Sequence, residues 1–472
     1  MVYDALAQVT PQATPIVPVA PTTIAETGIS TNSLLGLLLK AMYVRGIELG
    51  TELADEMKIG VSIVQDLMDE ARSRKLLETR GSEGGSIKTE IRYGLTLKGQ
   101  DWATQALELS QYVGPAPVSL PDFHAQVKKQ PILGEHVEHS ALVEGLSEFV
   151  VPESLVRRLG QALNSARTLL LYGAPGNGKT TLAEIIGELF EDAIFIPYCI
   201  EVDAKIIKIY DPALHVEVTD PATLLQKIPE IADFKPRDID GRWVACKRPM
   251  VRAGGELTLE MLDLQFNPHS KFYEAPLHVK AICGTFLIDD LGRQLVEPEV
   301  LLNRWITPMD RRADYLSLDT GRTFIVPFDV FVIFATNLTP EDLMDPAFLR
   351  RIPYKVRVSR PSPEEYREVF RKLCVRFGLT YDDAAVSFVM DKIVNVLNQP
   401  LSFYQCGFVV DQILTACKYT GRVARFDVDL LVDALDNISL HEGMIQLDAT
   451  EETIRSSEDA GVSYAGDDGV LQ

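Results

Sequence analysis

Cysteine is scarce in this sequence, and its spacing excludes the usual uses of paired thiols. The six cysteines are scattered along the chain, with no Cys-x-x-Cys pair and no nearby pair of histidines (Cys199, Cys246, Cys283, Cys374, Cys406 and Cys417). Zinc sites and redox motifs require such close spacing. We therefore expect buried free thiols in a reducing compartment, the cytoplasm. His269 and His278 also lack metal-ligand spacing with carboxylates, which predicts ordinary surface histidines.

Long apolar runs and positive charge are also in short supply. No run reaches the roughly 18 residues that a membrane-spanning helix needs, and the N-terminus lacks the pattern of a secretion signal. Lysine and arginine number 46 against 67 aspartates and glutamates, so the net charge is −21. Because nucleic acids and anionic lipids are bound by clustered basic residues, this balance disfavours non-specific binding to either. A local cluster of basic residues is still compatible with this net charge. We expect no membrane insertion.

Composition and periodicity divide the chain into six stretches. They are a Pro- and Thr-rich tail expected to be disordered or extended (1–30), a winged-helix-like domain (31–109), a linker (110–140), an α/β region (141–360), a helical region (361–440) and an acidic tail expected to be disordered (441–472).

The stretch "LLLYGAPGNGKTTLAEIIG" at 169–187 carries the strongest chemical signal. An apolar run at 167–172 predicts a buried parallel strand. The apolar residues after the loop have helical spacing (Leu182, Ile185, Ile186, Leu189 and Phe190). Between strand and helix, the loop fits the pattern G-x-x-x-x-G-K-[ST] (Gly173, Ala174, Pro175, Gly176, Asn177, Gly178, Lys179 and Thr180, followed by Thr181).

This pattern is typical of a loop that binds the phosphates of a nucleotide. Its glycines let backbone N–H groups surround a phosphate at a helix N-terminus. Lys179 would reach the β- and γ-phosphates, and the Thr180 hydroxyl would ligate Mg²⁺. The sequence therefore predicts ATP and Mg²⁺ as cofactors.

Two further apolar strands end in polar residues. The stretch "GTFLIDD" ends in Asp289 and Asp290, and the strand predicted at 330–335 is followed by Thr336 and Asn337. Beside the phosphate-loop strand, Asp289 would hold Mg²⁺ through water and Asp290 would polarise the attacking water. The Asn337 amide could orient water near the γ-phosphate; alternatively, it only begins a turn.

These motifs together resemble those of AAA+ ATPases. The phosphate loop, "GTFLIDD", "VFVIFATN" and "DPAFLRRI" are similar in order and character to Walker A, Walker B, sensor 1 and the arginine-finger box. The stretch "YLSLDTGRTFIV" resembles the β-hairpin that precedes sensor 1 in the MoxR-like, magnesium-chelatase-like and enhancer-binding groups, and 319–321 suits its turn. The resemblance covers roughly residues 141–440.

The resemblance implies an α/β P-loop core with a parallel sheet, followed by a helical lid. It also implies an ATPase that assembles as a ring, usually a hexamer, with nucleotide at the subunit boundaries. By position, Arg351 or Arg350 would reach the γ-phosphate on the neighbouring subunit, and we favour Arg351 because it directly precedes an apolar residue. The alternative is two surface arginines that close a helix.

The sequence departs from the family pattern in three places. Asp290 stands where Walker B normally has glutamate, which favours slow turnover. Cys406 and Gly407 stand where sensor 2 would have Pro-Arg, so lid sensing is lost, supplied from elsewhere, or misaligned. The stretch between the two Walker motifs, 180–286, is also longer than the core requires.

Residues 31–109 predict a winged helix. Ser62 and Gln65 fit a capping box for a helix with one apolar face, and alternating residues after a Gly-rich turn fit a hairpin. The predicted recognition helix exposes Asp66, Asp69 and Glu70, which would repel phosphates. We therefore expect a remodeller of a protein client. The alternatives are a DNA-acting AAA+ protein, such as a transcriptional activator or branch-migration motor, and a slow nucleotide-dependent switch.

Overall fold

The structure is a computed structural model that describes residues 16–83 and 90–438. The chain forms two compact units, and each is described by itself. The first comprises residues 1–142, 156–171 and 183–356, and the second comprises 143–155, 172–182 and 357–472. None of the helices within the described ranges combines the length and apolar character of a membrane span.

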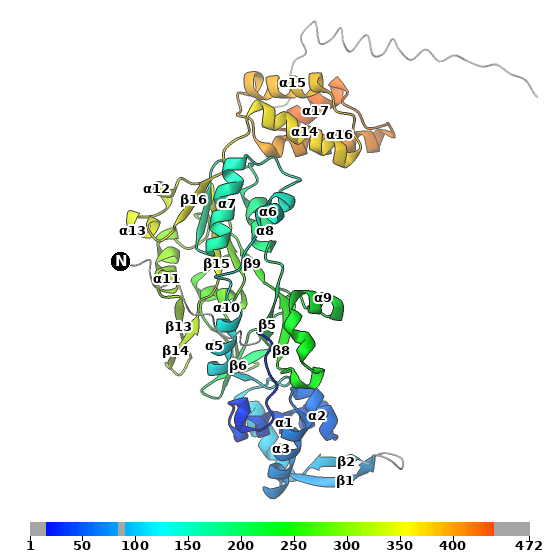
Figure 1. Ribbon diagram of the computed structural model, residues 1–472, viewed down its shortest axis with the longest axis vertical. Helices are drawn as coiled ribbons and strands as arrows, with labels where there is room; N and C mark the ends of the chain where they lie inside the picture. The colour runs from blue at the N-terminus through cyan, green and yellow to red at the C-terminus, as the bar shows by residue number, and fades with distance from the viewer. Residues whose placement is uncertain (1–15, 84–89, 439–472) are drawn as a thin grey trace, which may run out of the picture. The chain divides into compact units, whose positions relative to one another are not determined.

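The predicted α/β core is confirmed as a five-stranded parallel sheet (Figure 1). Its strand order is β16 (Tyr354–Arg357), β4 (Leu169–Tyr172), β15 (Phe331–Thr336), β12 (Thr285–Ile288) and β9 (Met250–Ala253). Every residue of β12 and β15 is buried. Parallel sheets are covered on both faces, which explains why these strands are continuous apolar runs in the sequence.

The elements next to these strands agree with the predicted pattern to within two residues. Helix α8 (Lys179–Glu188) follows β4, although it ends before the predicted apolar positions Leu189 and Phe190. The predicted hairpin is confirmed: β13 (Ala313–Ser317) pairs antiparallel with β14 (Thr323–Pro327). Gly321 lies in its turn with φ of 80°, a conformation that favours glycine.

The long stretch between α8 and β12 adds a second sheet in the first unit. Its strand order is β10 (Gln265–Asn267), β11 (Phe272–Glu274), β7 (Lys205–Lys208), β6 (Cys199–Val202) and β3 (Val118–Ser119). The same stretch holds the pair β5 (Ala193–Pro197) and β8 (Trp243–Lys247) and the short helices α9 (Pro221–Lys227) and α10 (Leu277–Lys280).

The stretch at 110–140, expected to be a linker, is built into this unit. It supplies β3 and helix α5 (Leu120–Lys129), and Phe123, Val127 and Ile132 are buried. Similarly, Val17 is buried and Val19 forms a β-bridge with Ile239, so the described part of 1–30 is not a free tail. Proline-rich composition indicated extended backbone, and here that backbone pairs with residues 238–240 of the inserted stretch, just before β8. Residues 1–15 and the acidic stretch 441–472 lie outside the described residues.

The N-terminal helices and hairpin follow the predicted order. They are α1 (Thr31–Arg45), α2 (Gly50–Met57), α3 (Val61–Ser73), β1 (Leu77–Glu83), β2 (Glu90–Leu95) and α4 (Leu97–Leu109). The expected capping box of Ser62 is wrong. Helix α3 has Gly60 as its N-cap, with no side-chain cap, and Ser62 lies one residue inside the helix. The Gln65 amide instead donates to Asp69.

His278 is another correction, because it is buried rather than on the surface. Its side chain is 3% exposed and its Nε2 lies 2.8 Å from Asp314 Oδ2. Arg304 also pairs with Asp314. Burial by itself would raise the pKa of Asp314, but the hydrogen bonds and charges of His278 and Arg304 outweigh it and lower the pKa to about 2. The sequence around His278 contains no pattern that predicts Asp314 as its partner. His269 is exposed, as expected.

The six cysteines are confirmed as buried free thiols.

In the second unit, four helices and one turn of π-helix form a separate core. They are α14 (Pro363–Phe377), α15 (Asp383–Asp391), η5 (Lys392–Val396), α16 (Phe403–Thr420) and α17 (Val428–Ile438). Their largest buried side chains, Tyr366 and Phe370, pack at 5.4 Å between ring centroids.

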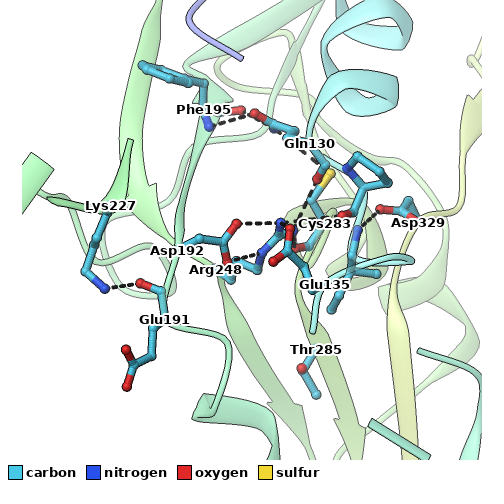
Figure 2. Close-up of polar contacts among 12 residues, drawn as sticks. Gln130, Glu135, Glu191, Asp192, Phe195, Lys227, Arg248, Cys283, Thr285 and Asp329 are labelled. Atoms are coloured by element: carbon cyan, nitrogen blue, oxygen red, sulfur yellow. Dashed lines mark hydrogen bonds and ion pairs between the residues drawn. The ribbon is translucent and has the colours of Figure 1, made fainter. Parts of the chain in front are cut away.

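A buried guanidinium joins several segments of the first unit (Figure 2). Arg248 donates twice to Asp192, with both distances 2.6 Å, and once to Glu135 at 2.8 Å. It also donates to the carbonyls of Gln130 and Cys283 at 3.1 and 2.6 Å. The Arg248 side chain is 2% exposed, and a buried charge is stable only when opposite charges and hydrogen-bond acceptors surround it.

We predict that Arg248→Met destabilises the first unit by about 3 kcal/mol, because Asp192 and Glu135 lose their partner and two carbonyls lose a donor. Urea unfolding followed by tryptophan fluorescence measures this, since all three tryptophans lie in that unit (Trp102, Trp243 and Trp305). The control Arg237→Met removes an arginine that is 78% exposed and should change stability by less than about 0.5 kcal/mol. Equal effects of the two substitutions would contradict the prediction.

Candidate functional site

The predicted phosphate loop, which follows β4 and leads into α8, belongs to the second unit. Gly173, Gly176 and Gly178 have φ of 144°, 75° and 77°, a region in which side chains are strained. A Cβ at Gly173 would overlap the Val358 carbonyl. The glycines of the motif are therefore required by the backbone conformation.

Two side chains of the loop fold back onto it. Lys179 Nζ donates to the Ala174 carbonyl at 3.0 Å, and Asn177 Nδ2 donates to the same oxygen at 3.2 Å. Both side chains belong to buried residues. The Lys179 ammonium, the one positive charge of the motif, thus lies against the loop backbone. Pro175 and Gly178 are exposed, whereas Thr180 is half-buried and Thr181 is exposed.

The predicted acidic pair lies at the end of β12 in the first unit. Asp289 is 7% exposed and pairs with Arg252 at 2.8 Å. Arg252 comes from the neighbouring strand β9, where it is opposite Leu287, and it also pairs with Glu184 at 2.5 Å. Sequence reasoning missed Arg252, because only strand pairing brings it beside Asp289.

Asp290 and Asn337 meet at the ends of adjacent strands. Asn337 Nδ2 donates to Asp290 Oδ1 at 3.0 Å, because β12 and β15 pair in parallel. Asp290 is half-buried and has φ of 49°. Gln294 donates to the Asp290 carbonyl at 3.3 Å, which helps to hold this turn. Each motif by itself predicted only a role toward the attacking water, and the hydrogen bond between the two side chains is found in the structure alone.

The two arginines expected to act on a neighbouring subunit differ in environment. Both follow the short helix α13 (Pro346–Leu349). Arg350 is exposed, whereas Arg351 is half-buried and its Nε donates to Asp310 Oδ2 at 2.8 Å. Asp310 lies in helix α11 (Pro298–Arg311). An ion pair thus orients Arg351 within its own chain, while Arg350 extends from the surface.

The positions aligned with sensor 2 offer no charge. Cys406 is buried in the core of the second unit, where its Sγ lies 3.9 Å from the Tyr366 carbonyl, and burial raises the pKa of its thiol. The first residues of α16 contact the phosphate loop instead. Tyr404 N donates to the Gly176 carbonyl at 2.9 Å, a contact for which the sequence holds no motif.

No cluster of three or more His, Cys, Asp or Glu side chains in the described ranges could hold a metal by itself. The candidate magnesium ligands, Thr180 and Asp289, come from two different motifs. The buried Asp289 carboxylate already faces the Arg252 guanidinium, so its position accepts positive charge. Carboxylate and hydroxyl oxygens are donors that Mg²⁺ accepts.

Comparison with known proteins gives one family match and several similar structures. A model described as a domain of unknown function (DUF8689) matches residues 362–437, the stretch from the start of α14 into α17. No curated protein matches the sequence.

Similar solved structures include the RuvB Holliday junction branch migration motor of Thermotoga maritima, at 16% identity and a TM-score of 0.33, covering 66% of this chain and 77% of that one. Domain III of the replication initiation protein DnaA, also from Thermotoga maritima, has 15% identity and a TM-score of 0.33, covering 62% and 95%. NtrX of Brucella abortus, in complex with ADP, has 13% identity and a TM-score of 0.37, covering 67% and 61%.

Proposed function

We propose that this chain is an AAA+ ATPase. The observation that carries the proposal is the loop after β4, in which three glycines adopt positive φ and the motif lysine lies against the loop. Backbone of this kind at the start of a helix binds phosphate. The ATP phosphates would be bound by the amides of 173–181, and Lys179 would leave the Ala174 carbonyl for the β- and γ-phosphates.

Mg²⁺ would neutralise phosphate charge when bound, with the Thr180 hydroxyl and the Asp289 carboxylate as its protein contacts. Both follow strands of one parallel sheet, β4 and β12. Arg252 would then give up Asp289 and keep its pairing with Glu184. This exchange of one cation for another leaves the buried carboxylate compensated throughout.

Hydrolysis would depend on Asp290 and Asn337. The Asp290 carboxylate would polarise the attacking water as a general base, and the Asn337 amide, which donates to it, would fix its orientation. With one methylene less than glutamate, Asp290 reaches less far, so we expect slow turnover. Loss of the Asn337 hydrogen bond would leave the carboxylate free to rotate.

We further propose a ring of identical subunits, with a hexamer as the expected form, in which Arg351 acts on the nucleotide of its neighbour. Its ion pair with Asp310 orients the guanidinium near the end of α11. A cation placed there offsets the negative charge that develops in the transition state. Arg350 is the alternative, and its exposure suits a contact between subunits.

The client would be a protein docked on the N-terminal module. In this module four arginines near helix α3 and the hairpin are already paired with acidic side chains. Arg72 pairs with Asp69 and Arg74 with Glu70, while Arg80 and Arg92 share Glu48. Phosphate contacts would require these pairs to break, which weakens the alternative of a DNA-acting protein.

The first test of the proposal concerns nucleotide binding. Lys179→Ala removes the only side-chain charge in the loop, so the affinity for ATP should fall by about tenfold or more. Titration with a fluorescent ATP analogue in the presence of Mg²⁺ measures this. Lys235→Ala, which removes an exposed lysine outside the loop, is the control and should bind as the parent chain does. Unchanged affinity in the Lys179 variant would refute the phosphate-loop assignment.

The second test concerns the ring. Arg351→Ala subunits should bind ATP normally but hydrolyse it about a thousandfold more slowly. When they are mixed with Lys179→Ala subunits, some turnover should return, because an intact loop then meets an intact arginine. Mass photometry verifies that mixed oligomers form. Failure of complementation in verified mixed oligomers would point to Arg350 or to a site within one subunit.

The third test concerns DNA. We predict that the full-length chain binds random duplex DNA no tighter than about 10⁻⁵ M near physiological salt, the range of non-specific binding. Fluorescence anisotropy across a salt series measures this affinity. Selection from a random-sequence library covers the case of a specific site. A selected motif bound at nanomolar affinity would overturn protein docking and favour the DNA-acting alternative.

A further inference from the structure

Helix α16 of the second unit begins directly at the phosphate loop. The first N–H groups of a helix have no partner within it and must be satisfied from outside. Here Phe403 N donates to the Asn177 side-chain oxygen at 3.4 Å, and Tyr404 N donates to the Gly176 carbonyl at 2.9 Å. The preceding Ser402 N donates to Gln405 Oε1 at 2.8 Å. Two of the N–H groups that have no partner within α16 therefore donate to the loop.

The contact with Tyr404 determines the direction of a loop amide. In a trans peptide unit, the C=O and the next N–H point in opposite directions. Because the Gly176 carbonyl points toward Tyr404 N, the N–H of Asn177 points away from α16. That N–H belongs to the run of amides that the motif offers to phosphate. Without the Tyr404 donor, this peptide unit would be free to rotate.

The Asn177 side chain extends the same contact. Its Oδ1 accepts from Phe403 N, and its Nδ2 donates to the Ala174 carbonyl, which also accepts from Lys179 Nζ. Asn177 is 4% exposed. A continuous series of hydrogen bonds thus runs from the first turn of α16 through Asn177 to the lysine of the motif.

The Tyr404 ring covers Gly176. A Cβ at Gly176 would overlap this ring, so the glycine is required both by its φ and by the close approach of α16. The ring remains 49% exposed, and its contribution is contact rather than burial. The N–H, in contrast, makes a directed hydrogen bond to the loop. The two groups of Tyr404 can therefore be separated by substitution.

We propose that the backbone N–H of Tyr404 positions the phosphate loop for nucleotide, so that the lid contributes to ATP affinity without a sensor 2 arginine. This inference rests on the proposed nucleotide binding. Tyr404 is a positioning residue, because it acts through the Gly176 peptide. The presence of Cys406 and Gly407 in place of Pro-Arg then does not separate the lid from the loop, since the start of α16 already contacts the loop through its backbone.

The experiment compares substitutions that keep or remove the N–H. Tyr404→Pro removes the donor at the second position of α16, where proline is compatible with a helix, and should weaken ATP binding about fivefold, the value of one hydrogen bond. Tyr404→Phe and Tyr404→Ala keep the donor and should stay within about twofold of the parent chain. Glu364→Pro places proline at the same position of α14, away from the loop, and should bind as the parent does.

Hydrogen exchange of the α16 amides at 409–417 separates positioning from a merely structural role. These amides should exchange equally in the parent chain and in Tyr404→Pro. If proline unfolds α16, the α-hydroxy analogue of tyrosine at position 404, introduced by nonsense suppression, replaces only the N–H by oxygen, and the fivefold loss should appear there. ATP binding within twofold of the parent in the folded variant without the donor would overturn this proposal. Absence of ATP binding by the parent chain would instead refute the proposed function.

Discussion

The first unit depends on the buried guanidinium of Arg248. It joins residues 130–135, which precede the core, to Asp192 after α8 and to the Cys283 carbonyl before β12. Cys283 N in turn donates to the Asp329 carbonyl just before β15, and Ile132 N donates to the Asp329 side chain. Since Asp289 and Asn337 directly follow β12 and β15, these contacts hold the starts of the two strands that carry the proposed site residues.

Side chains of the inserted stretch at 180–286 also form hydrogen bonds and ion pairs with the segments that flank the N-terminal helices and with the hairpin. Arg242, buried with Asp240, donates to the carbonyls of Thr27 and Pro117 at 3.1 Å each. The hairpin turn is held by Tyr273, whose hydroxyl accepts from Asp319 N at 3.0 Å, and by Arg322, which pairs with Asp203. The extra length between the Walker-like motifs is therefore a scaffold that joins both ends of the first unit.

The phosphate loop illustrates how one local conformation can serve two purposes. Its glycines permit the positive φ on which the proposed phosphate binding depends. The absence of a side chain at Gly176 also lets Tyr404 approach. The N–H groups that begin α16, which need partners in any helix, are satisfied by the loop. The need of a helix N-terminus for hydrogen-bond partners thus connects α16 to this loop.

Local sequence was enough to predict the loop, the strands that precede it and Asp289, and the hairpin, because each depends on residues near one another in the chain. It placed Asp290 and Asn337 after apolar strands, but their hydrogen bond depends on the parallel pairing of β12 with β15. Tertiary structure alone decided the rest. The packing of 110–140, the burial of His278 beside Asp314, the pairing of Arg252 with Asp289 and the contact of Tyr404 with Gly176 join residues far apart in sequence. Such contacts arise from packing and backbone hydrogen bonds, which leave no periodic signal in the chain.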